Sequence, residues 1–178
     1  MDLTEKTLKS QDIFSGRVFH VQVDTVSLPN GHESIRELVL HHGGVAVIAV
    51  DADGRVPMVR QYRKAIEMHS LEIPAGKLEP GEDPVTCGMR ELEEETGLVA
   101  KALLHLGEYF PTPGYCSEKI NIFLAQELSK SKQALDPDEF LDVEYYTLDT
   151  LVEMVMNQEI QDAKTVIAIL KAEKILKQ

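Results

Sequence analysis

Residues 76–98 read GKLEPGEDPVTCGMRELEEETGL and hold the most informative pattern in the chain. Asp83 followed by Pro84 is a favourable helix start, because an aspartate caps the first turn and proline fits the first helical position. Gly97 suits the residue just past a helix end, where glycine adopts the left-handed conformation at low cost. The stretch therefore predicts a glycine-rich loop followed by a helix between Pro84 and Gly97.

Three glutamates of this helix are expected on one face. At about 100° per residue, Glu91, Glu94 and Glu95 lie close together on the helical wheel. The apolar stripe expected to pack on a sheet lies beside them and consists of Val85, Gly88, Met89 and Leu92. Like charges three and four residues apart destabilise a helix by about 0.2 to 0.5 kcal/mol per pair. A hard divalent cation would compensate, since magnesium binds a few carboxylates together with water and phosphate oxygens.

Arg90 lies next to Glu94 on the wheel, and we expect its guanidinium to hold a neighbouring carboxylate in one rotamer. The alternative is a solvated acidic face without function, the usual meaning of an isolated glutamate run. The preceding glycine-rich loop favours a functional site over this alternative. Gly88 does so too, because a mid-helix glycine costs about 1 kcal/mol of helix stability unless close packing requires it. No calcium-loop, Cys-x-x-Cys or His-x-x-x-His pattern is present, which disfavours calcium-sensor and structural zinc sites.

Composition excludes several classes of protein. The 178 residues include 18 basic and 30 acidic side chains, a net charge of −12, and no long basic stripe, so nucleic acid is disfavoured as a partner. No run approaches the roughly 20 apolar residues of a membrane span. The N-terminus lacks a basic opening followed by an apolar run, so a cytoplasmic location is expected. Cys87 and Cys116 are then expected as free thiols.

The rest of the chain predicts an α+β fold of mixed strands and few helices. Alternating apolar residues from Val21 to Leu28, the turn signal Asn30–Gly31 and a second run at 33–40 indicate a hairpin. We therefore expect an antiparallel β appendage over 1–43 and a main domain over 44–178. Further strands are expected at 44–50, 56–60, 71–73, 98–108, 119–125 and 141–147, and closing helices near 148–156 and 162–177.

The spacing of the 76–98 segment resembles a known family. Its specified residues match the complete Nudix box with no departure: Gly76, Glu82, Arg90, Glu91, Leu92, Glu94, Glu95, Gly97 and Leu98. The resemblance implies a Nudix α/β/α sandwich with an N-terminal antiparallel β hairpin. It also implies hydrolysis of a nucleoside diphosphate linked to another group, with Mg²⁺, or Mn²⁺ as the alternative. The implied metal ligands are the carbonyl of Ala75 and the carboxylates of Glu91, Glu94 and Glu95.

Outside the box the chain resembles the ADP-ribose pyrophosphatase branch of this family. Pro113 lies 16 residues after Gly97, where the branch carries a characteristic proline in its substrate loop. Arg63 matches the residue that reaches the substrate phosphates, and a guanidinium offers two parallel donors to phosphate oxygens. Arg36 and Glu37 resemble adenosine-side contacts supplied by the N-terminal hairpin, often across a dimer.

Two further acids complete the implied site. Glu118 could accept hydrogen bonds from ribose hydroxyls or position a metal-bound water. Glu139 matches a mobile loop glutamate that assists the attacking water, and only the alignment favours it over the neighbouring Asp138. The implied catalytic residues are thus Glu139, Glu94 and Arg90.

The implied reaction is Mg²⁺-dependent cleavage of ADP-ribose to AMP and ribose 5-phosphate. Two alternatives stay open: another nucleoside diphosphate sugar or a nucleoside triphosphate as substrate, and a regulator that binds ADP-ribose without cleaving it. The intact box disfavours the regulator, because a family member that no longer catalyses a reaction is expected to have lost metal ligands. A homodimer is also expected, since a hairpin of about 40 residues buries little surface alone.

Overall fold

The computed structural model describes residues 2–177, which form two compact units. The first unit contains the chain up to Gly43 together with Phe110–Lys119, and the second contains Gly44–Tyr109 and the chain from Ile120 onward. Residues 110–119 thus belong to the unit of the N-terminal strands, although the sequence predicts them in the main domain. Within residues 2–177, no helix is long and apolar enough to cross a membrane.

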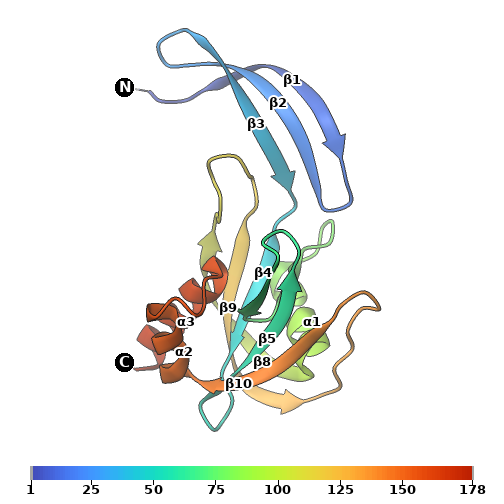
Figure 1. The fold of residues 1–178 in the computed structure, drawn as a ribbon, viewed down its shortest axis with the longest axis vertical. Coiled ribbons are helices and arrows are strands. Elements are labelled where there is room, and N and C mark those ends of the chain that lie inside the picture. The colour runs from blue at the N-terminus through green and yellow to red at the C-terminus, as the bar shows by residue number, and fades with distance from the viewer. Residues whose placement is uncertain (1, 178) are drawn as a thin grey trace. The chain divides into compact units, whose positions relative to one another are not determined.

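The first unit is an antiparallel sheet of three strands, β1 (Lys6–Ser15), β2 (Phe19–Ser27) and β3 (Glu33–His41), in that order (Figure 1). The predicted hairpin corresponds to β2 and β3, and Gly31 in its turn has the positive φ of 83° that favours glycine. Strand β1 was not predicted from the sequence. All of its residues are exposed, and its sequence lacks the alternation of apolar and polar residues that marks a half-buried strand.

The second unit contains two sheets. A four-stranded sheet has the order β7-β4-β9-β8, and a three-stranded sheet has the order β10-β5-β6. Strands β4 and β9 pair in parallel, whereas the other pairs are antiparallel. The bounds are β4 Gly44–Ala49, β5 Arg55–Arg63, β6 Met68–Glu72, β7 Ala75–Lys77, β8 Leu98–Tyr109, β9 Ile120–Lys130 and β10 Leu141–Thr147.

The predicted helix of the central motif is confirmed as α1 (Pro84–Thr96). The Asp83 carboxylate caps it by accepting the backbone N–H groups of Val85 and Thr86, and Gly97 ends it in the left-handed conformation, with φ of 68°. The closing helices are confirmed as α2 (Leu148–Met156) and α3 (Ala163–Leu176).

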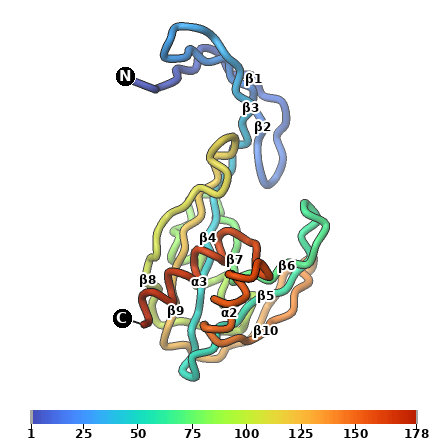
Figure 2. The backbone as a smooth tube through the Cα atoms, turned by 60° about the vertical axis from the view of Figure 1, so that its left-hand side comes forward, coloured from blue at the N-terminus to red at the C-terminus, as the bar shows by residue number. Residues whose placement is uncertain are grey.

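Helices cover both faces of the four-stranded sheet, as Figures 1 and 2 show. Because side chains alternate along a strand, β4 contributes to two cores. Val45 and Val47 pack in the core beneath α1, whereas Ala46 and Ile48 pack in the core shared with α2 and α3. The predicted α+β class and α/β/α sandwich are therefore confirmed.

The face of α1 that packs inward differs from the predicted stripe. Val85 is 42% exposed, so its predicted burial was wrong, and Cys87 is fully buried instead. The buried face is centred on the glutamates, because it includes Glu91 and Glu95 as well as Leu92. Glu91 and Glu95 therefore lie inside the contact between the helix and the strands, whereas the side chain of Glu94 is 40% exposed.

The close packing predicted at Gly88 is observed. A Cβ there would lie 3.0 to 3.2 Å from side chains of Leu103, Val45 and Val47. The mid-helix glycine therefore lets α1 approach β4 and β8 closely.

Candidate active site

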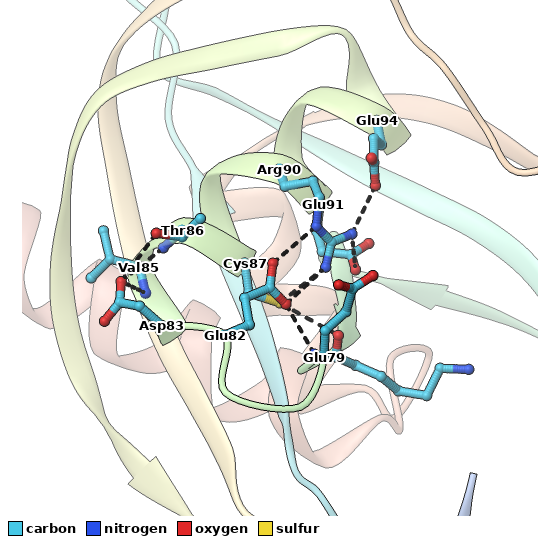
Figure 3. A network of polar contacts seen from close by, with 10 residues as sticks. Glu79, Glu82, Asp83, Val85, Thr86, Cys87, Arg90, Glu91 and Glu94 are labelled. Atoms are coloured by element: carbon cyan, nitrogen blue, oxygen red, sulfur yellow. Dashed lines mark hydrogen bonds and ion pairs between the residues drawn. The ribbon is translucent and has the colours of Figure 1, made fainter. Parts of the chain in front are cut away.

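The guanidinium of Arg90 is the centre of a network of carboxylates on α1 and the preceding loop (Figure 3). Its Nε and Nη2 donate to the two oxygens of Glu82, at 3.1 and 3.2 Å. Its Nη1 donates to Glu91 Oε1 at 2.8 Å and to Glu94 Oε2 at 2.9 Å. Hydrogen bonds to these acids raise the pKa of Arg90, and its guanidinium lowers the pKa of Glu82. Arg90 thus fixes the orientation of three acids.

Gly76 makes room for the Glu91 carboxylate. A Cβ at residue 76 would lie 1.8 Å from Glu91 Oε1, closer than non-bonded atoms approach, so the carboxylate can keep this position only beside a glycine. Burial raises the pKa of Glu91, and the charges of Glu94 and Glu139 raise it further, although Arg90 opposes them. The close approach of the Glu91 carboxylate therefore explains why residue 76, the first glycine of the Nudix box, is a glycine.

Glu95 is a buried carboxylate with a backbone partner. It is 4% exposed, and its Oε2 accepts the Ala75 N–H at 3.0 Å. Burial raises the pKa of Glu95 to about 8, and the charges of Glu91 and Glu139 act in the same direction. The Ala75 N–H bond and the Arg63 charge only partly offset this effect. Glu95 therefore needs a further positive charge to be stable as an anion.

The available oxygen donors fit a hard divalent cation. We call Glu91, Glu94 and Glu95 the carboxylate trio. Glu91 lies against Gly76 and Glu95 against Ala75, so the Ala75–Gly76 backbone borders both carboxylates. Carboxylate and backbone carbonyl oxygens are donors that Mg²⁺ and Mn²⁺ accept.

The trio does not form a ready-made metal centre. Across the described residues 2–177, no three His, Cys, Asp or Glu side chains converge into a group that could hold an ion. The reason lies in Arg90, which engages Glu91 and Glu94 through one nitrogen, while Glu95 bonds to the backbone. Cation binding therefore requires these carboxylates to turn away from their present partners.

Arg63, predicted to bind phosphates, is held by a buried acid at the end of β6. Its Nε and Nη2 donate to the two oxygens of Glu72, at 2.8 and 2.6 Å. Lys164 Nζ lies 2.5 Å from the same carboxylate. Burial opposes ionisation of Glu72, but the two cations lower its pKa to about 2. Sequence reasoning missed Glu72 and Lys164, since they are 92 positions apart and no local pattern joins them.

Glu139 lies in the 131–140 loop of the same unit. A turn orders it locally, because Glu139 N donates to Asp136 O at 3.0 Å and Asp136 N donates to Glu139 Oε2 at 3.3 Å. Its charge raises the pKa of both Glu91 and Glu95. The fold thus brings Glu139 within electrostatic range of two members of the trio.

The other predicted substrate-binding residues belong to the first unit. Arg36 makes a two-bond ion pair with Glu5, at 2.9 and 2.5 Å. Glu118 Oε1 lies 3.7 Å from His41 Nδ1. Glu37 lies on β3 and Pro113 lies in the 110–119 loop, which bonds to β3 through Val39 and Tyr115. The remaining predicted residues, Ala75, Arg63, Arg90, Glu139 and the trio, lie in the second unit.

Comparison with known families agrees with the fold and the acidic helix. The NUDIX domain model matches residues 40–168, and the chain belongs to the Nudix family. A second model, described as the nucleoside diphosphate sugar hydrolase N-terminal domain, matches residues 5–39.

Individual relatives are similar over nearly the whole chain. The ADP-ribose pyrophosphatase of Bacillus subtilis (strain 168) is 48% identical, over 94% of this chain and 91% of that protein. The methanol dehydrogenase activator of Bacillus methanolicus is 49% identical, over 93% and 90%. A crystal structure of an ADP compounds hydrolase superposes with a TM-score of 0.86 at 26% identity, covering 99% of this chain and 97% of that one. The predicted resemblance to Nudix hydrolases and their ADP-ribose pyrophosphatase branch is confirmed.

Proposed function

We propose that this protein is a divalent-metal-dependent Nudix hydrolase that cleaves the diphosphate of ADP-ribose to AMP and ribose 5-phosphate. The observation that carries the proposal is the buried Glu95 carboxylate, whose burial and acidic neighbours are only partly compensated by the Ala75 N–H bond and the Arg63 charge. Such a carboxylate is costly unless a cation completes its environment. The similarity to the Bacillus subtilis ADP-ribose pyrophosphatase supports the choice of substrate.

We propose the following roles for the residues of the site. Glu91, Glu94, Glu95 and the Ala75 carbonyl would hold Mg²⁺, or Mn²⁺ as the alternative. A bound divalent cation lowers the pKa of a coordinated water and neutralises charge on a diphosphate. Arg90 keeps Glu91 and Glu94 oriented before the ion arrives, and Arg63 donates to phosphate oxygens. Glu139 accepts the proton of the attacking water.

The first unit is proposed to serve the adenosine and ribose side of the substrate, through Arg36, Glu37, Pro113 and Glu118. The match of residues 5–39 to the N-terminal domain of nucleoside diphosphate sugar hydrolases supports this role. We also propose that this 1–43 appendage mediates a homodimer and that residues 44–178 form the catalytic domain, in a cytoplasmic protein.

Exposed apolar side chains on β1 support the dimer. Leu8, Ile13 and Phe14 are each more than half exposed, although a strand of a small sheet gains stability by burying such groups. Light scattering at micromolar concentration should give the mass of two chains, and a monomeric mass would contradict the dimer.

A second candidate function is activation of an alcohol dehydrogenase. The Bacillus methanolicus relative named as a methanol dehydrogenase activator is as similar as the pyrophosphatase, and over the same extent. Adding the protein to a methanol dehydrogenase assay tests this candidate. A rise in dehydrogenase rate that Glu95→Gln abolishes would support it, and an unchanged rate would eliminate it for that dehydrogenase.

The hydrolase proposal is tested with a panel of nucleotide sugars and nucleoside triphosphates, with product identification, in Mg²⁺ and in excess chelator. AMP and ribose 5-phosphate from ADP-ribose, formed only with the metal, are expected. Faster hydrolysis of another nucleotide sugar, or release of pyrophosphate from a triphosphate, would reassign the substrate. Full activity in chelator would contradict the metal dependence.

A further inference from the structure

The first turn of α3 contacts the chain segment that leads from β6 to Ala75. Lys164 Nζ lies 2.5 Å from Glu72 Oε2 and 2.9 Å from Asp162 Oδ2. In the same turn, Thr165 Oγ1 accepts the Ile73 N–H at 3.0 Å and donates to Asp162 at 2.6 Å. One helical turn therefore holds the side chain of residue 72 and the backbone of residue 73.

Glu72, the acid at the centre of this contact, forms ion pairs with two cationic side chains, those of Arg63 and Lys164. The Glu72 side chain is 3% exposed, and both of its oxygens accept bonds from Arg63 while Oε2 also accepts from Lys164. The side chain of Lys164 is 11% exposed, whereas that of Arg63 is 42% exposed. Arg63 is thus the partner of Glu72 that reaches solvent, and the charge of Glu95 also acts on it.

A buried carboxylate with a single cation holds that cation tightly, because loss of the partner leaves an uncompensated buried charge. With a second cation already bonded, Glu72 can release one guanidinium N–H without becoming unpaired. Lys164 therefore decides how much of the Arg63 charge remains available to a second anion.

We propose that Lys164 is a positioning residue, which compensates Glu72 so that Arg63 can bind a substrate diphosphate while still anchored to β6. The inference rests on the proposed function, since it assigns to Arg63 the phosphate contact of that reaction. It adds Lys164 and Glu72, in chain segments outside the Nudix box, to the machinery that sets substrate affinity.

The first test compares Lys164→Met with Lys174→Met, which removes the same charge from an exposed position of α3. Lys164→Met should raise the KM for ADP-ribose about tenfold, an effect of about 1.4 kcal/mol, with a much smaller change in kcat. Lys174→Met should leave both constants at the wild-type values. Lys164→Arg, which keeps the charge, should restore most of the affinity.

The second test asks whether Lys164 acts through Glu72. In a Glu72→Gln background the buried charge is absent, so Lys164→Met should change the KM less than about twofold. An undiminished effect in that background would mean that Lys164 contacts the substrate itself and would overturn the proposal. A lower Tm for Lys164→Met with an unchanged KM would also overturn it, because the residue would then be merely structural.

Calorimetric titration of the same variants with ADP separates this inference from the proposed function. Binding of ADP needs no turnover, and its affinity should fall about tenfold in Lys164→Met but not in Lys174→Met. If the wild type fails to cleave ADP-ribose yet shows this pattern with ADP, the proposed substrate is wrong and the positioning role stands. If the wild type cleaves ADP-ribose and ADP affinity is the same in all variants, the positioning role is wrong.

Discussion

Replacing Glu95 with glutamine is expected to stabilise the metal-free protein at pH 8 while abolishing hydrolysis. The carboxyl is buried and its pKa is raised from 4.5 to about 8, mainly by that burial. Below pH 4.5 it is protonated in the folded and unfolded states alike. As the pH rises, the unfolded state ionises first, so stability falls until the folded-state carboxyl also ionises near pH 8.

The magnitude follows from the size of this pKa change. At about 1.4 kcal/mol for each pH unit, ionisation of this one carboxyl lowers wild-type stability by about 5 kcal/mol between pH 4.5 and pH 8. Glutamine cannot ionise and keeps an oxygen for the Ala75 N–H, but its amide nitrogen needs an acceptor. We therefore expect Glu95→Gln to exceed the wild type by about 2 to 5 kcal/mol at pH 8 and to match it near pH 4.5.

The assay is urea unfolding in excess chelator across this pH range. Glu93→Gln is the matched control, since it makes the same charge change on α1 and Glu93 bonds to Ser131 rather than to the trio. The control should stay within about 0.5 kcal/mol of the wild type at each pH. Mg²⁺ should then stabilise the wild type and the control but not Glu95→Gln. A Glu95→Gln protein that is less stable than the wild type at pH 8, or whose stability difference is independent of pH, would refute the reasoning.

Three further predictions concern single residues. Gly76→Ala should lower kcat/KM for ADP-ribose by about 100-fold, because its Cβ would fill space that the Glu91 carboxylate occupies beside residue 76; normal kinetics would show that Glu91 does not need this space. Glu72 has a pKa lowered to about 2 by its ion pairs, so its contribution to stability is present above pH 4.5 and is lost as the pH falls toward 2. Acid unfolding should therefore be less steep in Glu72→Gln, and identical profiles would contradict this. Cys87 is fully buried and burial raises the pKa of its thiol to about 12, so iodoacetamide should modify it only after unfolding, as peptide mass spectrometry can check.

Local signals in the sequence predict the central helix and its acids well. Asp83, Pro84 and Gly97 define α1 through capping geometry, which depends only on neighbouring residues. The box spacing predicts the family, and helical periodicity predicts that Glu91 and Glu95 share a face. Periodicity does not say which part of the stripe packs inward, so the burial of Cys87 and the exposure of Val85 were missed.

Features that depend on distant parts of the chain could not be predicted. The pairing of Glu72 with Lys164 joins β6 to α3, and neither residue belongs to a recognisable motif. The steric need for Gly76 appears only when the 75–77 strand lies against α1. Strand β1 was missed because it is exposed along its whole length and its apolar residues, Leu8, Ile13 and Phe14, do not alternate with polar ones.

The most direct test of the central claim is a crystal structure with Mg²⁺ and a non-hydrolysable ADP-ribose analogue. We expect Glu91 and Glu95 to have turned from Arg90 and the Ala75 N–H toward metal ions that bridge them to the diphosphate, with Arg90 still bonded to Glu82. A diphosphate bound far from α1, with Glu91 and Glu94 still bonded to Arg90 and no ion at Glu95, would contradict the claim.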